Sequence, residues 1–267
     1  MSLTKLIFEF IIVVLRYNMK KTEIIVADKR IQIEYYDSVL STNTLLKELN
    51  SSECGLIHAA IADTQSGGRG RLGKSFYCPS NCGLYMSFRL DGDLVFSYQY
   101  LTVVSAVAVV RAIYEIFGVK CDIKWVNDLY LNSKKVCGIL CEGVFDNGAI
   151  NSAIVGIGVN IAEPKGGYPK EIKDVAGALC QQYSDEIRDR LAKMILIKFF
   201  DVLKLDSQSL YHEYKDSLFI IGRTVTFIRN NIRTEATVEG LSSDFSLLVS
   251  HDGIVESLNS GEITIKT

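Results

Sequence analysis

One stretch of this sequence runs from residue 63 to residue 76 and reads Asp63-Thr64-Gln65-Ser66-Gly67-Gly68-Arg69-Gly70-Arg71-Leu72-Gly73-Lys74-Ser75-Phe76. Its four glycines let the backbone come close to a ligand, because they carry no Cβ. The three cations, Arg69, Arg71 and Lys74, suit an anionic ligand. We therefore predict a ligand-binding loop that the rest of the fold holds in position.

Residues 68–75 of this loop formally fit the phosphate-binding pattern G-x-x-x-x-G-K-[ST]. That pattern binds phosphate where a strand leads in and a helix leads out. Residues 56–62 read as a buried strand, but Pro79 and Gly83 follow too closely for a helix. We therefore reject a P-loop. A glycine-rich hairpin with solvated cations remains the plain structural alternative.

Four other short motifs share the chain with this loop. In order they are Ser41-Thr42-Asn43, Lys124-Trp125-Val126-Asn127-Asp128, Lys134-Lys135-Val136-Cys137-Gly138-Ile139-Leu140-Cys141-Glu142 and Gly156-Ile157-Gly158-Val159-Asn160. Each is weak alone, but in this order, together with Gly-Arg-Gly-Arg, they resemble the biotin protein ligases over roughly residues 33 to 267. Those enzymes join biotin to the carrier domains of biotin-dependent carboxylases.

The resemblance implies an α+β fold of the biotin/lipoate ligase kind, similar to class II synthetases, with a central mixed sheet and helices. A small SH3-like β-barrel is expected to follow it. The implied parts are a catalytic domain over residues 19–219 and a barrel over residues 220–267. Short alternating strands punctuated by glycines begin after Gly222, which agrees with a small barrel there.

Local signals predict several elements of this fold. Ser41 or Thr42 can cap a short helix, and Gly118 can end a long apolar one. The expected helices are residues 98–117, 187–205 and 209–217, and the expected strands of the first part include residues 24–26, 31–36, 121–125, 135–142 and 149–159. We expect the helix over residues 98–117 to be buried against the sheet, because it is apolar on most sides.

The resemblance also implies a reaction in two steps, in which biotin and ATP give biotinyl-AMP and pyrophosphate before a carrier lysine attacks the mixed anhydride. The protein's own work is positioning and charge stabilisation. The expected catalytic residues are Arg69, Arg71, Lys124, Asp128 and Lys135. Mg²⁺ is expected with ATP. Asp128 is a candidate for binding that ion, for orienting Lys124 or for accepting the carrier lysine's proton.

The remaining site residues are carried over from the same resemblance. Biotin is expected to contact Ser41, Thr42, Asn43, Gln65, Gly68, Arg69, Gly70, Arg71, Lys135 and Gly138. The nucleotide is expected to contact Arg71, Phe76, Lys124, Asn127, Gly156 and Asn160. From the residues alone, plainer interpretations stay open: a helix cap at Ser41, a solvent-facing glutamine at Gln65 and a tight strand ending at Asn160.

Two positions depart from the family pattern. The family usually has proline where Val126 stands, so a fixed φ is lost before Asn127. It often has tryptophan where Phe76 stands, and phenylalanine keeps the apolar wall without the N–H donor. Neither change removes a charged participant.

Composition limits the partners. With 29 Lys+Arg against 31 Asp+Glu, the net charge of −2 argues against a nucleic-acid surface. The seven cysteines show no secreted pattern and suit a reducing cytoplasm. A zinc site joining Cys78 and Cys82 to Cys137 and Cys141 is the sharpest metal alternative, and buried free thiols are the one we favour.

The first eighteen residues are apolar, but Glu9 interrupts them and they fall short of the ~20 residues that span a bilayer. We expect no membrane segment there, and we hypothesise that translation begins at Met19. Only about 33 residues precede the shared region, too few for the winged-helix domain of some biotin ligases. We therefore expect no DNA binding. A homodimer is common in the family.

Two rival functions remain at this stage. A lipoate or octanoate ligase has the same fold, although its glycine-arginine loop usually differs. A non-catalytic biotin-binding module would keep the pocket without turnover. We also expect the glycine-rich loop to be mobile when empty and to close over the adenylate, because ordering its glycines is costly.

Overall fold

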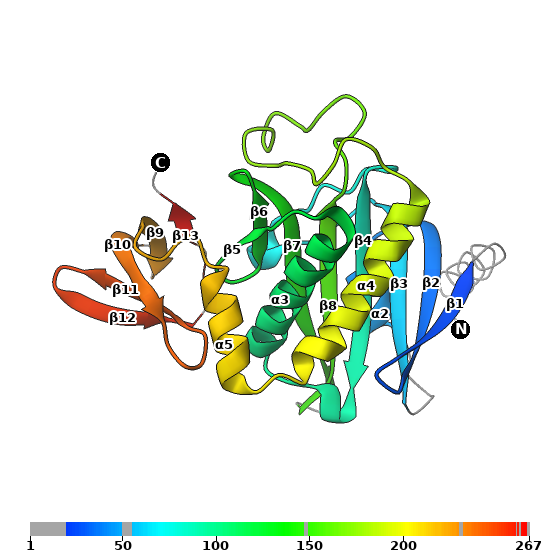
Figure 1. Cartoon of the computed structure of the whole chain (residues 1–267), viewed down its shortest axis with the longest axis horizontal. Coiled ribbons are helices and arrows are strands. Elements are labelled where there is room, and N and C mark those ends of the chain that lie inside the picture. Colours follow the sequence, from blue (N-terminus) through cyan, green and yellow to red (C-terminus); the bar gives the residue numbers. More distant parts are fainter. Residues whose placement is uncertain are drawn as a thin grey trace, which may run out of the picture.

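The larger part of the structure is an eight-stranded mixed sheet, seen in a computed structural model (Figure 1). The described residues are 20–49, 55–146, 149–229, 232–259, 261 and 263–265. The predicted extension over residues 1–18 and Met19, the expected start of translation, lie outside them.

The strand order of the large sheet is β1-β2-β3-β4-β8-β7-β6-β5. The strands are β1 (Lys21–Val26), β2 (Lys29–Val39), β3 (Leu56–Gln65), β4 (Gly83–Asp91), β5 (Asp122–Lys124), β6 (Asp128–Leu131), β7 (Lys134–Asp146) and β8 (Ala149–Asn160). All neighbours pair antiparallel except β2 and β3, which are parallel and are joined through the short helix α2 (Thr42–Lys47). This sheet and the separate antiparallel sheet described below confirm the expected α+β class.

Two long helices, α3 (Tyr98–Phe117) and α4 (Asp185–Leu203), cover one face of the sheet (Figure 1). Ser97 caps α3, and Gly118 ends it with a φ of 67°. Alternation along β3 explains the layers, since Ala59 and Ile61 join the main core. By length and composition α3 would qualify as a membrane span, but most of it is buried in this core.

The opposite face carries α2, with a smaller apolar cluster of its own. Leu46 packs there with Ala60 of β3 and Ile154 of β8. The helix ends at Lys47, and Leu49, two residues beyond it, packs partly buried against the same cluster. A helix of six residues gains little stability from its own backbone, so its contacts with the sheet decide where it sits.

The C-terminal part forms a second, antiparallel sheet. Its order is β12-β11-β10-β9-β13, built from β9 (Thr224–Arg229), β10 (Ile232–Leu241), β11 (Leu247–His251), β12 (Ile254–Leu258) and β13 (Ile263–Ile265). Helix α5 (Ser207–Asp216) precedes it. The expected small C-terminal β unit is therefore present, while the exact boundary at residue 220 stays a prediction.

Two hydrogen bonds hold the segment that follows β5, and one of them comes from the C-terminal part. Trp125 Nε1 donates to Phe245 O at 2.9 Å. Tyr214 OH, from α5, donates to Val126 O at 3.0 Å. The peptide bond between Trp125 and Val126 is cis. The Trp125 side chain is thus held by the loop between β10 and β11, and the Val126 carbonyl is held by α5.

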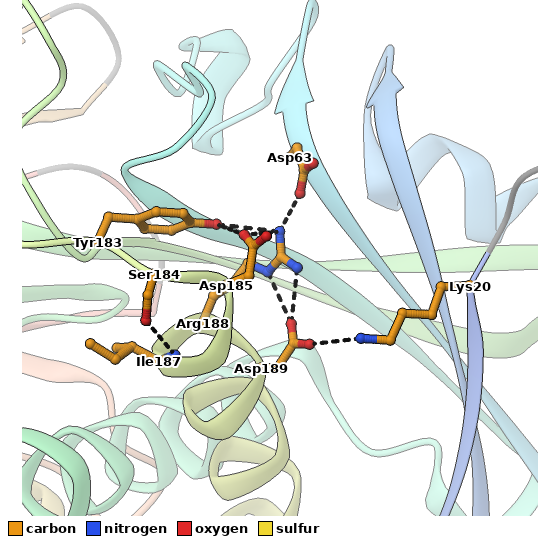
Figure 2. Close-up of polar contacts among 8 residues, drawn as sticks. All are labelled: Lys20, Asp63, Tyr183, Ser184, Asp185, Ile187, Arg188 and Asp189. Carbon is orange, nitrogen blue, oxygen red and sulfur yellow. Dashed lines mark hydrogen bonds and ion pairs between the residues drawn. The ribbon is translucent and has the colours of Figure 1, made fainter.

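A buried arginine ties the end of β3 to α4 (Figure 2). The Arg188 guanidinium forms ion pairs with Asp63 of β3 and, at 3.0 Å, with Asp189 of its own helix. Lys20 contacts the second oxygen of Asp189 at 3.3 Å. Because a buried charge needs paired partners, this network fixes the strand from which the glycine-rich loop departs.

The sequence-based prediction missed one strand. Residues 121–125 and 135–142 were expected to be successive strands, but β6 lies between β5 and β7 and pairs with both. It has only four residues, with no long apolar alternation to signal it.

Candidate active site

The glycine-rich loop joins β3 to β4 as a small closed hairpin. Gly70 N–H donates to Lys74 O at 2.7 Å, and Phe76 N–H donates to Gly68 O at 2.9 Å. A Cβ on Gly68 would lie 2.5 Å from Phe76 O, so this position requires glycine. The only helical turn in the loop is three residues long, which agrees with rejecting a P-loop.

The N-terminus of α2 lies against β3 and β4 through buried polar contacts. Ser41 caps the helix, as expected, by accepting from Thr44 N–H. Thr42 N–H donates to Gln65 Oε1 at 2.8 Å, and Thr42 Oγ1 lies 2.6 Å from Ser87 Oγ. Gln65 therefore faces α2 and not solvent, which decides against its plainer interpretation.

Asn43 is the most completely satisfied residue of this group. Its Oδ1 accepts from Ser87 Oγ at 2.5 Å, and its Nδ2 donates to Glu142 Oε2 at 2.8 Å. A Cβ on Gly156 would overlap Asn43 Oδ1. The structure thus brings Gly156 to the α2 side, beside the predicted biotin residue Asn43.

Glu142 gathers three side chains around its carboxylate. Besides Asn43, it accepts from Lys47 Nζ at 2.7 Å and lies 3.4 Å from Arg69 Nη2. Burial opposes ionisation of Glu142, but the hydrogen bonds from Lys47 and Asn43 outweigh it and hold its pKa below the ordinary value. Arg69, the first arginine of the loop, is therefore placed on the α2 side of the site.

Arg71, the second arginine, turns the other way. Its Nη1 donates to Asn127 Oδ1 at 3.1 Å. Asn127 is fixed on β7, because its Nδ2 donates to Ile139 O at 3.0 Å and its carbonyl accepts from Ile139 N–H at 2.9 Å. The loop therefore spans two groups of residues, one at each arginine.

Lys135 lies beside Asp128, with Nζ 2.7 Å from Oδ1. Its backbone is clamped as well, since Lys135 N–H donates to Val175 O at 2.7 Å and its carbonyl accepts from Gly177 N–H at 2.9 Å. Lys124 stands opposite Asp128 in the register of β5 and β6. The three charged residues predicted from two separate motifs are thus neighbours.

Asn160 supports the same clamp. Its Nδ2 donates to Gly177 O at 3.0 Å and to Lys135 O at 3.4 Å. Both amide N–H donors are therefore engaged by backbone carbonyls, and Oδ1 is the atom left to accept from a ligand.

Phe76 lies flat on a glycine patch of the sheet. Gly138 and Gly158 pair across β7 and β8, and a Cβ on either would contact the Phe76 ring, at 3.1 and 2.6 Å. Tyr85 approaches the ring edge-on at 6.5 Å between centroids. Phe76 thus forms an apolar wall between the two groups at the arginines.

Two residues of the site were not predicted, Ser87 and Glu142. Ser87 sits in an ordinary-looking strand, and its role depends on contacts across more than forty positions of sequence. Glu142 closes the motif that begins at Lys134, so its place in the pattern was a usable signal.

A sequence model described as the biotin/lipoate A/B protein ligase family matches residues 35–160 of this chain. A solved structure, the biotin protein ligase from Aquifex aeolicus in complex with biotin and ATP, superposes with a TM-score of 0.73 at 27% identity, covering 88% of this chain and 98% of that one. The part of the chain over residues 35–160 belongs to the biotin/lipoate A/B protein ligase family. The resemblance to the biotin protein ligases predicted from the sequence motifs is therefore confirmed.

Two relatives in this family show how far the likeness extends. The bifunctional ligase/repressor BirA of Bacillus subtilis is 35% identical over 62% of this chain and 51% of its own length. The biotin–[acetyl-CoA-carboxylase] ligase of Paracoccus denitrificans is 36% identical over 38% of this chain and 43% of its own length. The chain thus spans about half the length of these biotin protein ligases.

Proposed function

We propose that this chain is an ATP-dependent biotin ligase, which forms biotinyl-AMP and transfers biotin to a lysine of a carrier domain. The observation that carries the proposal is the opposed placement of the two loop arginines. Arg69 lies with the predicted biotin residues at Glu142, and Arg71 lies with the predicted nucleotide residue Asn127. An acyl adenylate has its acyl part and its nucleotide joined at one phosphate, so a single loop can hold both.

In the first step a carboxylate oxygen of biotin attacks the α-phosphorus of ATP, and pyrophosphate leaves. Guanidinium groups bind carboxylate and phosphate through paired, charge-assisted hydrogen bonds, which suits Arg69 and Arg71 to the joining point. Lys135 adds an ammonium held in place by Asp128 and by its clamped backbone. These fixed charges oppose the negative charge that develops during the transfer.

In the second step the amine of a carrier lysine attacks the acyl carbonyl, and AMP leaves. No nucleophile from this protein is required, so its contribution is orientation and charge. The carrier proposed is a biotin carboxyl carrier domain of a biotin-dependent carboxylase, supported by the name of the Paracoccus relative. A cytoplasmic setting and a homodimer remain part of the proposal.

Mg²⁺ is proposed to accompany ATP and to neutralise part of its phosphate charge. The described residues contain no cluster of three acidic, histidine or cysteine ligands. Asp128 offers one carboxylate, already paired with Lys135. A metal held by Asp128 would therefore take its other ligands from phosphate oxygens and water, as Mg²⁺ commonly does.

The test is pyrophosphate exchange into ATP, with biotin, lipoate and octanoate supplied separately, followed by a mass measurement on a carrier domain. We expect exchange with biotin, and a carrier mass increase that a lysine-to-arginine carrier lacks. Exchange with lipoate or octanoate alone would reassign the substrate. Biotin binding without any exchange would make the chain a binding module.

A further inference from the structure

Arg89 is a buried charge that the site described so far does not use. It lies on β4, two residues after Ser87, with only 6% of its side chain exposed. Because β-strand side chains alternate, Arg89 and Ser87 point to the same face of the sheet, the face that carries α2. A buried guanidinium is costly unless its donors are satisfied, so its partners indicate its role.

Two partners of Arg89 lie in the last turn of α2 and just beyond it. Nη1 donates to Leu49 O at 2.6 Å and to Leu46 O at 3.3 Å. The last carbonyls of a helix have no partner within the helix, and they form the negative end of its dipole. The guanidinium therefore holds one carbonyl of the last turn of α2, that of Leu46, and the carbonyl of Leu49 in the segment directly after the helix.

The other donors anchor the guanidinium to the sheet. Nε donates to Asp91 Oδ1 at 2.9 Å, and Nη2 donates to Ser152 Oγ of β8 at 2.7 Å. One end of the side chain is thus fixed by β4 and β8, while Nη1 holds the helix end.

We propose that Arg89 is a positioning residue for biotin, which sets the place of Thr42 and Asn43 by holding the far end of α2. This inference rests on the proposed function. The helix has six residues, so its C-terminal carbonyls lie about one and a half turns from Thr42. A shift at one end of so short and rigid a rod moves the other end with it.

The apolar contacts of α2 are too few to replace this bond. Leu46 is the one fully buried residue of the helix in the small cluster with Ala60 and Ile154, and Leu45 packs against that cluster only partly buried. The remaining contacts at the N-terminal end are polar and need exact distances, such as Ser87 Oγ to Asn43 Oδ1 at 2.5 Å. Loosening the C-terminal end therefore disturbs the geometry of the biotin side first.

The test uses Arg89→Lys and Arg89→Gln, two variants because loss of a buried partner can prevent folding, and one folded variant suffices. Ser152→Ala is the matched control, since it removes a bond to the same guanidinium and leaves both bonds to α2. Hydrogen–deuterium exchange over residues 42–49 reports the helix directly, and calorimetry reports the Kd for biotin.

In the Arg89 variants we expect faster hydrogen–deuterium exchange over residues 42–49. We also expect the Kd for biotin to rise about tenfold, which corresponds to about 1.4 kcal/mol, close to the energy of a hydrogen bond to a charged group. The KM for ATP is expected to stay within about twofold, because Arg71 and Asn127 lie on other elements. Arg89→Lys, which keeps the charge, is expected to lose less than Arg89→Gln. Ser152→Ala is expected to match the wild type in exchange and in affinity.

Unchanged exchange in a folded Arg89 variant would overturn the inference. So would faster exchange with unchanged biotin affinity, or equal losses toward biotin and ATP. If the wild type binds no biotin, the proposed function fails, while exchange over α2 still reports whether Arg89 holds the helix.

Discussion

Asp128 Oδ1 lies 2.7 Å from Lys135 Nζ, across the pairing of β6 with β7. The sequence had left three roles open for Asp128: orienting Lys124, binding Mg²⁺ and accepting a proton. The ion pair adds a fourth, which is to hold the ammonium of Lys135. Lys135 has its backbone clamped by Val175 and Gly177, so Asp128 fixes the remaining freedom of its side chain.

This pairing predicts coupled effects of Asp128→Asn and Lys135→Met. Each change alone is expected to slow biotin-dependent pyrophosphate exchange on the order of tenfold or more, the cost of a charge-assisted bond. The double variant is expected to be little slower than the slower single variant, because both remove the same positioned charge. If the double variant is slower by the product of the two single factors, the pairing is contradicted. A raised Mg²⁺ requirement confined to Asp128→Asn would indicate a metal ligand.

The glycine-rich loop is predicted to be protected by its ligands. Arg69 is half exposed, so trypsin is expected to cut at Arg69 or Arg71 in the free protein. Biotin together with ATP is expected to slow this cleavage, since we propose that both arginines contact the adenylate. Exposed Lys165, in the segment between β8 and α4, serves as the internal control. Equal protection at Lys165, or none at the arginines, would count against closure of the loop.

Glu142→Gln is predicted to change stability in a pH-dependent way. The pKa of Glu142 is lowered in the folded state. The ionised carboxylate therefore stabilises the fold when the pH is above its ordinary pKa of 4.5, and this stabilisation is lost as the pH falls through the lower pKa of the folded state. The free energy of unfolding of the wild type is expected to exceed that of the variant by about 1 kcal/mol near neutral pH. This difference is expected to disappear as the pH falls below 4.5. Urea unfolding of both proteins across this range measures it. A gap that widens toward acid would refute the assignment.

Gly158→Ala is predicted to displace the Phe76 ring. Its Cβ would lie 2.6 Å from Phe76 Cε1. Overpacking of this kind costs ~1–3 kcal/mol, and the KM for ATP is expected to rise because Phe76 lines the predicted nucleotide side. Gly70→Ala is the stability control, with its nearest atom at 3.4 Å. Adding Phe76→Ala should relieve the overpacking. A double variant whose stability loss equals the sum of the two single losses would contradict this prediction.

Much of the fold was predictable because its signals are local. Ser41 caps α2, and Gly118 ends α3 at the residue expected, since capping and left-handed backbone depend on neighbours in sequence. The predicted site residues stay predictions as ligand contacts, although the structure brings most of them together. The polar network at Asn43 was not predictable, because Ser87 and Glu142 reach it only after four strands and a helix have assembled.

The bond between Trp125 and Phe245 joins residues separated by 120 positions. A chain emerging from the ribosome can pair β3, β4, β7 and β8 and seat α2 well before residue 245 is made, because synthesis runs from the N-terminus. The segment that carries Lys124 and Asn127 gains this partner only near the end of synthesis. We therefore expect the predicted biotin residues to reach their folded positions first during synthesis. The predicted nucleotide residues are expected to do so only when the last tenth of the chain has been made.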